Sequence, residues 1–129
     1  MEPMPVSVRY IVTDVDAATS FYTEMLGFKV EMRLAPAFAI LSKEDFRLML
    51  SRPGGSGGGG QATPDGQVPA PGGWNRIQIE VEDLTGTVTR LKRAGCRFRN
   101  EIVTGIGTKQ ILLEDPAGNP IELFERLRS

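Results

Sequence analysis

The sequence predicts an α+β protein built from two copies of one unit, a strand, a helix and three further strands. Three observations support this prediction. Each half of the chain opens with alternating apolar residues, and a helix-like apolar pattern follows. Val12 and Asp14 recur as Val81 and Asp83, at a constant offset of 69 residues. Self-similarity at a fixed offset is the signature of an internal repeat.

A glycine- and proline-rich segment separates the two halves. Thirteen of the twenty-one residues from Pro53 to Gly73 are Gly or Pro. Such a stretch has little apolar surface to bury, so we expect a connecting loop, with a lid over a site as the alternative. We therefore expect one domain over residues 1–129, with module one at about 5–52 and module two at about 74–127.

The first strand of each module follows from period-two alternation, which places successive side chains on opposite faces. In the first half one face carries Val8, Tyr10 and Val12, and the other carries Ser7, Arg9 and Ile11. In the second half the corresponding faces carry Ile77, Ile79 and Val81, and Arg76, Gln78 and Glu80.

A helix follows each of these strands. The first begins at an N-cap, Asp14 or Asp16, and ends at Gly27 in the left-handed conformation. The second runs from Asp83 to Gly95, with basic residues in its last turns that complement the helix dipole. The inward positions are Ala18, Phe21, Tyr22, Met25 and Leu26 in the first helix, and Leu84, Val88 and Leu91 in the second.

Short strand-like runs complete each module. They cover residues 29–34, 37–42 and 47–51 in the first half, and 97–103, 110–114 and 121–125 in the second. A turn at Glu114–Asn119 separates the last two runs, since it combines Pro116, which fixes φ, with Gly118, which supplies a positive φ, and with Asp and Asn, which bond to their own backbone.

Composition excludes several classes of function. Fifteen Lys and Arg stand against sixteen Asp and Glu, so no basic patch emerges and we expect no nucleic acid or anionic membrane as partner. No apolar run approaches the ~20 residues that span a bilayer, and the N-terminus lacks a signal-peptide pattern. Cys96 is the single cysteine and cannot form an internal disulfide. These features favour a cytoplasmic protein.

Three strings resemble the vicinal oxygen chelate superfamily, the group of glyoxalase I, bleomycin-resistance proteins and extradiol dioxygenases. They are DVDAATSFYTEMLGF at 14–28, VEDLTGTVTRLKRAG at 81–95 and LLEDPAGNPIELFE at 112–125. The resemblance implies two paired βαβββ modules that form a rolled mixed sheet around an open cup. It also implies a small molecule bound in that cup and, in most members, a homodimer.

Enzymes of this superfamily hold a metal with ligands from the first and last strand of each unit. Carried over by the resemblance, those positions fall on Ser7, Met49, Arg76 and Glu122. Only Glu122 is a usual ligand, Arg76 is a permanent cation, and the chain has no histidine. We therefore expect neither a metal nor another cofactor, which disfavours glyoxalase, dioxygenase and thiol transferase activity.

We predict that Arg76 and Glu122 form an ion pair, the guanidinium standing in for the lost cation. Two roles remain open for this pair: recognition of a polar group on a ligand, or structural neutralisation of two partly buried charges. Period two places further side chains on the same face. The predicted ligand-binding residues are Ser7, Arg9, Arg47, Met49, Trp74, Arg76, Gln78, Glu122 and Phe124, and Ile11, Ser51 and Glu80 share that face.

Trp74 and Cys96 could each have a functional role or a purely structural one. Trp74 either stacks on a ligand or packs near the start of a strand. Cys96 follows a helix-terminating glycine with no histidine to activate it, so we expect a quiet, partly buried thiol.

Three functions are compatible with the sequence. The first is a non-catalytic protein that binds a drug or metabolite, similar to the bleomycin-resistance branch. The second is a metal-independent lyase, isomerase or epimerase, with Glu122 as the tentative catalytic acid or base and Arg76 holding a developing negative charge. The third is an accessory module without a small ligand.

Overall fold

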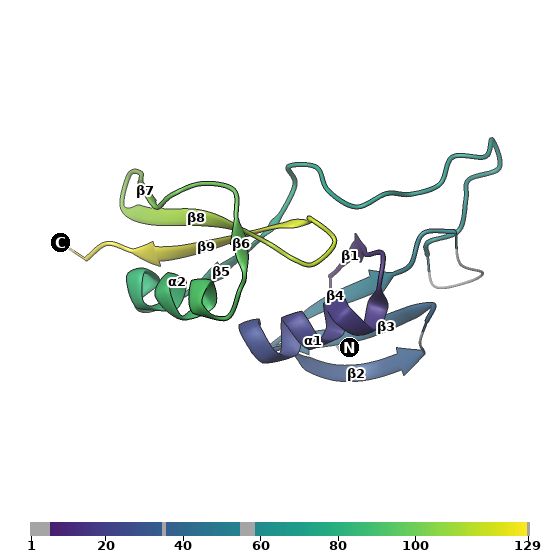
Figure 1. Cartoon of the computed structure of the whole chain (residues 1–129), viewed down its shortest axis with the longest axis horizontal. Coiled ribbons are helices and arrows are strands. Elements are labelled where there is room, and N and C mark those ends of the chain that lie inside the picture. The colour runs from purple at the N-terminus through teal and green to yellow at the C-terminus, as the bar shows by residue number, and fades with distance from the viewer. Residues whose placement is uncertain (1–5, 35, 55–58, 129) are drawn as a thin grey trace, which may run out of the picture. The chain divides into compact units, whose positions relative to one another are not determined.

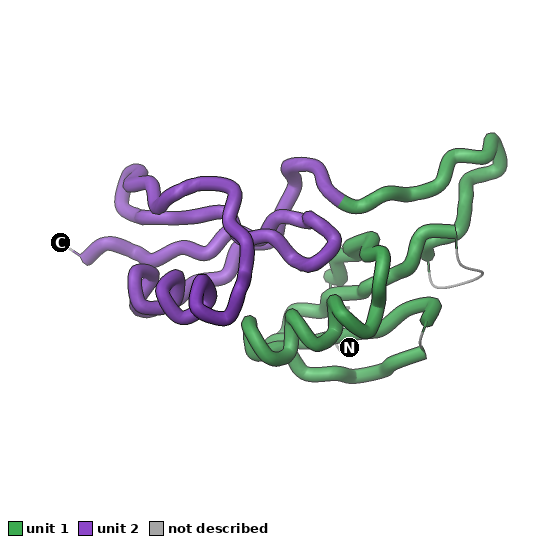
Figure 2. Tube along the Cα trace, viewed as in Figure 1, with its two compact units in different colours: residues 1–71 green, residues 72–129 purple. Residues whose placement is uncertain are grey.

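The chain forms two compact units, residues 1–71 and 72–129, in a computed structural model (Figure 2). The structure describes residues 6–34, 36–54 and 59–128. The boundary falls near the end of the predicted connecting loop. Each unit is one βαβββ module (Figure 1), which confirms the predicted fold class. That the two units make a single domain stays a prediction.

Module one is a four-stranded mixed sheet with one helix. Its elements are β1 (Ser7–Ile11), α1 (Val15–Leu26), β2 (Lys29–Leu34), β3 (Phe38–Lys43) and β4 (Phe46–Ser51). The strand order is β1-β4-β3-β2, with β1 parallel to β4 and the other pairs antiparallel. Parallel pairing of β1 and β4 requires a long connection, which here comprises α1, β2 and β3, with α1 crossing from β1 at one edge of the sheet to β2 at the other.

Helix α1 begins and ends where its capping residues predict. Of the two candidate N-caps, Asp14 is the one used: its side chain accepts a hydrogen bond of 3.0 Å from the backbone N–H of Ala17. The helix stops because Gly27 takes a left-handed conformation, with φ 75°. Thr19 is a buried polar residue inside this helix, and its hydroxyl donates to the Val15 carbonyl at 2.7 Å.

The core of module one lies between α1 and one face of the sheet. Helix α1 packs on β2, β3 and β4. On β3 and β4 the fully buried side chains alternate with half-buried or exposed ones, so the opposite face of the sheet is not covered by this helix. The buried members of the core are Tyr10, Val12, Val15, Ala18, Phe21, Tyr22, Leu26, Phe28, Ala39, Leu41, Leu48 and Leu50.

Module two repeats the plan with shorter elements. They are β5 (Ile77–Glu80), α2 (Leu84–Arg93), β6 (Arg97–Phe98), β7 (Val103–Thr104), β8 (Thr108–Glu114) and β9 (Pro120–Arg126). The order is β5-β9-β8-β6, with β5 parallel to β9 and with β7 also paired to β8. Its core comprises Leu84, Val88, Leu91, Ile111, Leu113, Ile121 and Leu123.

The strand registers confirm the internal repeat. Val8 on β1 lies beside Leu48 on β4, and 69 residues later Ile77 on β5 lies beside Ile121 on β9. In both modules these pairs share the face that the helix covers. The neighbouring pairs, Arg9 with Met49 and Gln78 with Glu122, therefore share the opposite face, which we call the open face of each sheet.

The strand predicted over Arg97–Val103 is wrong, because the ladder breaks after Phe98 and resumes only at Val103. The side chain of Asn100 explains the break: its Oδ1 accepts the backbone N–H of Leu112 at 2.9 Å, where a strand would offer a carbonyl. The other predicted strands hold, with starts shifted to Phe38, Phe46, Thr108 and Pro120.

The β8–β9 turn is built on Asp115, which is buried. Its Oδ1 accepts the backbone N–H groups of Ala117 and Asn119, both at 2.9 Å, and Gly118 has φ 90°. The predicted roles of Asp and Gly are confirmed. Asn119 differs, since its Nδ2 donates to Asp115 Oδ2 at 3.0 Å and its Oδ1 accepts the N–H of Gly72 at 2.8 Å.

The described part of the Gly- and Pro-rich segment forms turns, with no helix or strand at residues 53–54 and 59–73. A local turn spans Thr63–Gln67, where the Thr63 N–H donates to the Gln67 carbonyl at 2.8 Å. Residues 55–58 of the predicted loop lie outside the described residues. Its role as a connector or a lid stays a prediction. Within the described chain, no helix is long and apolar enough to cross a membrane.

Substitution of Gly95 tests the end of α2. Gly95 has φ 88°, and its N–H and that of Cys96 donate to the carbonyls of Lys92 and Leu91, both at 3.0 Å. A Cβ at Gly95 meets no atom within 4 Å, so Gly95→Ala tests backbone strain alone. We expect urea unfolding to show a loss of about 1 kcal/mol.

The matched control is Gly105→Ala, since Gly105 lies outside the left-handed region and has only ordinary contacts near its Cβ position. We expect the control to leave the free energy of unfolding within about 0.5 kcal/mol of the parent. Equal effects of the two substitutions would contradict this account of the helix end.

Candidate functional site

The open face of module two gathers three of the predicted site residues. Gln78 and Glu122 lie directly beside each other in the parallel β5–β9 pair, and Arg76 immediately precedes β5. Ile121 and Leu123 point the other way, into the core, because side chains alternate along β9. At this point the sheet places the Glu122 carboxylate between two nitrogen-bearing side chains.

Arg76 and Glu122 form the predicted ion pair. Arg76 Nε and Nη2 both donate to Glu122 Oε1, at 3.0 and 2.9 Å. Gln78 Nε2 donates to the other oxygen, Oε2, at 2.7 Å. Glu122 is only 4% exposed although it lies on the open face. A buried carboxylate is tolerated when it is paired and hydrogen-bonded, and both conditions hold here.

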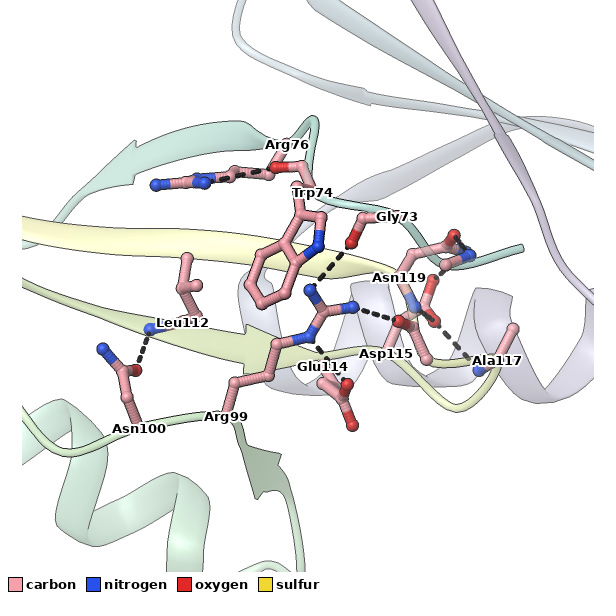
Figure 3. A network of polar contacts seen from close by, with 12 residues as sticks. Gly73, Trp74, Arg76, Arg99, Asn100, Leu112, Glu114, Asp115, Ala117 and Asn119 are labelled. Carbon is pink, nitrogen blue, oxygen red and sulfur yellow. Dashed lines mark hydrogen bonds and ion pairs between the residues drawn. The ribbon is translucent and has the colours of Figure 1, made fainter.

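A second arginine network lies on the same module and was missed in the sequence analysis (Figure 3). Arg99 Nε donates to Glu114 Oε2 at 2.8 Å, and its guanidinium carbon lies 4.7 Å from the centre of the Trp74 ring. Its Nη1 and Nη2 donate to the carbonyls of Gly73 and Gly118, at 2.7 and 2.9 Å. Arg99 thus holds both the segment before β5 and the β8–β9 turn.

The two networks meet at Trp74. Arg76 Nη1 donates to the Trp74 carbonyl at 3.2 Å, while Arg99 covers the Trp74 ring. Each arginine is matched by one glutamate, Glu122 or Glu114, so this part of the face has no net charge. No buried side-chain nitrogen or oxygen lacks a hydrogen-bond partner among the described residues.

The open face of module one holds the other predicted positions. Ser7 lies beside Arg47, and Arg9 lies beside Met49, in the parallel β1–β4 pair. Ser7, Arg9 and Arg47 are exposed, whereas Met49 is half-buried. These four residues and the Arg76–Glu122 pair therefore belong to different modules, and each group lies on its own sheet.

Module one also contains an acidic residue that the sequence analysis did not select. Glu31, on β2, accepts a hydrogen bond of 2.7 Å from the Ser42 hydroxyl. That hydrogen bond, together with the nearby charges of Lys29 and Arg47, lowers the pKa of Glu31 below its usual value. The Arg47 side chain therefore has a carboxylate in its neighbourhood.

Phe124 completes the predicted residues of module two. It is half-buried and lies beside Glu80 on β5 and Gln110 on β8, on the same open face as Glu122. Glu80 forms an exposed ion pair with Arg126 at 3.3 Å. The face therefore continues past the ion pair as a mixture of aromatic and polar side chains.

The donor set does not fit a divalent cation. Among the described residues, no three His, Cys, Asp or Glu side chains come together in a group able to hold a metal ion. In module two the only carboxylate at the four ligand-like positions is Glu122, and Arg76 already engages its Oε1 while Gln78 engages its Oε2. A divalent metal needs several free nitrogen, oxygen or sulfur donors, and a guanidinium is not one.

A protein-family model matches most of the chain. The model described as Glyoxalase/Bleomycin resistance protein/Dioxygenase superfamily matches residues 5–123. The chain belongs to this superfamily. Its two βαβββ modules, each with parallel first and last strands, agree with this assignment.

Solved structures share this glyoxalase-like fold. One is a member of the superfamily from Sphaerobacter thermophilus DSM 20745, with a TM-score of 0.76 and 22% identity, covering 97% of this chain and 98% of that one. Another is lactoylglutathione lyase from Agrobacterium tumefaciens, with a TM-score of 0.70 and 20% identity over 97% and 96% of the two chains. At these identities the likeness shows the fold alone.

A curated relative is similar over most of the sequence. The uncharacterized protein YwbC of Bacillus subtilis (strain 168) is 25% identical over 130 residues, which cover 90% of this chain and 92% of that protein. The superfamily assignment rests on the family model, and this relative is similar to the chain over nearly its full length.

Cys96 lies beside an open hollow at the C-terminal end of α2, of about 430 Å³, lined by Lys92, Cys96, Phe98, Arg99, Asn100 and Glu101. The thiol is half-buried. Burial raises the pKa of Cys96, and the opposing effect of the Arg90 charge is smaller. This agrees with the quiet thiol expected from the sequence.

Removal of Arg76 tests the energetics of the ion pair. Arg76→Leu leaves the buried Glu122 carboxylate without its charged partner, and we expect a loss of about 1–3 kcal/mol in the free energy of unfolding. The Arg76 side chain is 31% exposed, which keeps the loss below that of a fully buried pair. The double substitution Arg76→Leu with Glu122→Leu should recover at least half of it.

The control is Arg126→Leu, which breaks the exposed pair with Glu80, whose side chains are 72% and 49% exposed. We expect this change to remove less than about 0.5 kcal/mol in the same urea titration. If Arg76→Leu has no larger effect than Arg126→Leu, the ion pair does not stabilise the site.

The raised pKa of Cys96 gives a second test. A higher pKa means less thiolate at pH 8, and only the thiolate attacks a disulfide reagent. We expect the folded chain to react with 5,5′-dithiobis(2-nitrobenzoate) about 3- to 10-fold more slowly than the same chain in urea, with the midpoint of the rate–pH profile displaced upward. A faster reaction in the folded state would contradict a quiet thiol.

Proposed function

We propose that this superfamily member binds a small organic molecule, a drug or a metabolite, and does so without a metal. The observation that carries the proposal is the Arg76–Glu122–Gln78 arrangement. It places a fixed guanidinium on the one carboxylate at the four ligand-like positions. The face that would hold a metal-bound substrate in an enzyme of the superfamily is thereby supplied with a permanent, organic cation.

The charge arrangement supports binding rather than metal chemistry. A divalent cation approaching Glu122 Oε1 meets the Arg76 guanidinium at 2.9 Å from that oxygen. Displacing Arg76 would remove a charge-assisted hydrogen bond and leave the guanidinium to be rehydrated. The superfamily fold thus keeps its architecture here, while its metal site is degenerate.

The proposed ligand surface combines polar and apolar groups, as small-molecule sites commonly do. In module two the exposed Gln78, the exposed indole of Trp74 and the partly exposed Arg76 offer hydrogen bonds and a ring face, and Phe124 adds half-buried aromatic surface. The open face of module one separately offers Ser7, Arg9, Arg47 and Met49 as ligand contacts. This composition suits a ligand with carbonyl-like or anionic groups on an apolar frame.

A metal-independent enzyme is the second candidate, favoured by one observation. Glu122 is buried beside a guanidinium, which resembles a carboxylate placed to take a proton next to an anion-stabilising cation. Its two oxygens are already engaged by Arg76 and Gln78, so a proton transfer would first require one of these bonds to open. Turnover of a carbonyl substrate in the presence of chelator would favour this candidate.

Metal removal and ligand addition test the proposal together. The protein is stripped with chelator, its bound metal is measured by elemental analysis, and its thermal melting is recorded with Zn²⁺, Ni²⁺, Mn²⁺ and Fe²⁺. We expect no stoichiometric metal and no rise in melting temperature, because only a species that binds the native state stabilises it. A stoichiometric, stabilising metal would overturn the proposal.

The same melting assay is then run with a library of aromatic antibiotics and small carbonyl metabolites. At a ligand concentration of 100 times Kd the native state gains about 2.7 kcal/mol, a shift of several degrees for a chain of this size. We expect at least one compound to produce such a shift. A library without any stabilising or binding compound would count against a small-molecule function.

A further inference from the structure

Trp74 is the single tryptophan of the chain and lies in the segment that leads into β5. It is 68% exposed. Large aromatic side chains gain more than most from leaving water, and tryptophan is seldom left this open. An exposed indole beside the Arg76–Glu122 pair therefore needs a physical explanation.

The indole is held in place by Arg99 (Figure 3). All three guanidinium nitrogens of Arg99 are fixed, by Glu114 and by the carbonyls of Gly73 and Gly118, at distances of 2.7–2.9 Å. Because all three nitrogens are restrained, the guanidinium plane is held in one orientation. Its central carbon lies 4.7 Å from the centre of the Trp74 ring. One face of the indole is thus covered by a rigid partner.

The backbone beneath the indole is restrained as well. The Gly72 N–H donates to Asn119 Oδ1 at 2.8 Å, and the Trp74 carbonyl accepts from Arg76 Nη1 at 3.2 Å. Residues on both sides of Trp74 are therefore tied to the sheet or its turn. A ring that is ordered before a ligand arrives loses less conformational entropy on binding.

We call Arg99 with its three hydrogen-bond partners, Glu114, Gly73 and Gly118, the Arg99 clamp. The hydrogen bonds of this clamp do not involve the indole. Arg99 reaches the backbone carbonyls of Gly73 and Gly118 and the carboxylate of Glu114, none of which belongs to the Trp74 side chain. Replacing the Trp74 side chain therefore removes no partner of those bonds. The indole is an addition to the clamp, and it presents its second face outward.

We propose that Trp74, positioned by Arg99, is the surface on which a planar conjugated ring of the ligand stacks. This inference rests on the proposed small-molecule function and names the chemical class of its ligand. Arg99 is a positioning residue, because it acts on the ligand through the indole. Offset stacking of two rings adds binding free energy beyond the apolar area that it buries.

The charges around the indole favour a neutral ring. Arg99 and Arg76 are balanced by Glu114 and Glu122, so the surroundings neither attract nor repel an ion by net charge. The guanidinium on the inner face already uses the attraction of the indole π-system for a cation. A cationic ligand on the outer face would be repelled by the Arg99 charge on the other side of the indole, whereas a neutral ligand ring would not be.

The experiment uses the single indole as its own reporter. The ¹⁵N-labelled full chain gives one indole Nε1–H signal, which is followed in ¹H–¹⁵N spectra during titration with 2-naphthol, a planar neutral probe. The matched probe is trans-2-decalol, which has the same skeleton but is saturated and not planar. N-methylquinolinium, planar and cationic, tests the charge preference.

We expect 2-naphthol to move the indole signal saturably and to bind about 3- to 10-fold more tightly than the other two probes. Trp74→Phe retains a ring and should bind 2-naphthol within about 3-fold of the parent, whereas Trp74→Leu should bind it at least about 10-fold more weakly. Binding to these variants is measured by saturation transfer to the probe.

Arg99→Lys keeps the charge opposite Glu114 but loses the planar contact with the ring. We expect it to shift the free indole signal and to weaken 2-naphthol binding several-fold, while the amide signals of the core remain in place. The control is Ile106→Ala, which removes a fully exposed apolar side chain elsewhere in module two and should change nothing.

Several results would overturn the inference. They are equal affinity for 2-naphthol and trans-2-decalol, tighter binding of N-methylquinolinium, or an indole signal that stays fixed while other amides shift. Library compounds that stabilise the parent and Trp74→Leu equally would refute stacking while leaving the proposed function standing. Failure of every probe and every library compound to bind would refute both.

Discussion

The parallel pairing of the first and last strand in each module is the constraint on which the remaining structure depends. It requires a long connection between the two strands, which holds the helix and the other strands of the module, and it brings residues from opposite ends of the module into one row. In module two that row sets Gln78 beside Glu122 and leaves Arg76 at the entry to β5. A shift of one residue in this register would turn Glu122 into the core and Leu123 outward.

Charge neutralisation then decides which chemistry the row can support. Glu122 is buried on the open face because Arg76 and Gln78 cover it and satisfy both oxygens. The three hydrogen bonds that stabilise the buried carboxylate also engage both of its oxygens. The module one row, in contrast, presents the exposed Ser7 and Arg9 beside Arg47 and Met49. One superfamily fold thus carries two open faces of different character.

Local rules were enough for most of the elements: Asp14, Gly27 and the Asp115 turn follow from capping and turn chemistry. The ion pair was predicted from the resemblance, because the superfamily's ligand positions, carried over to this sequence, fall on Arg76 and Glu122. The Arg99 clamp could not be found this way. Its partners come from β8, the turn and the segment before β5, and the Asn100 side chain that breaks the strand gives no periodic signal.

The anchoring of Gly72 by Asn119 has a consequence for how such chains diverge. Trp74 and Arg76 take their positions from module two itself, through hydrogen bonds that begin at Gly72. Insertions or deletions upstream, between residues 59 and 71, lie outside that set of contacts. A change in the length of the segment from residue 61 to 71 therefore leaves intact the hydrogen bonds that hold Trp74 and Arg76.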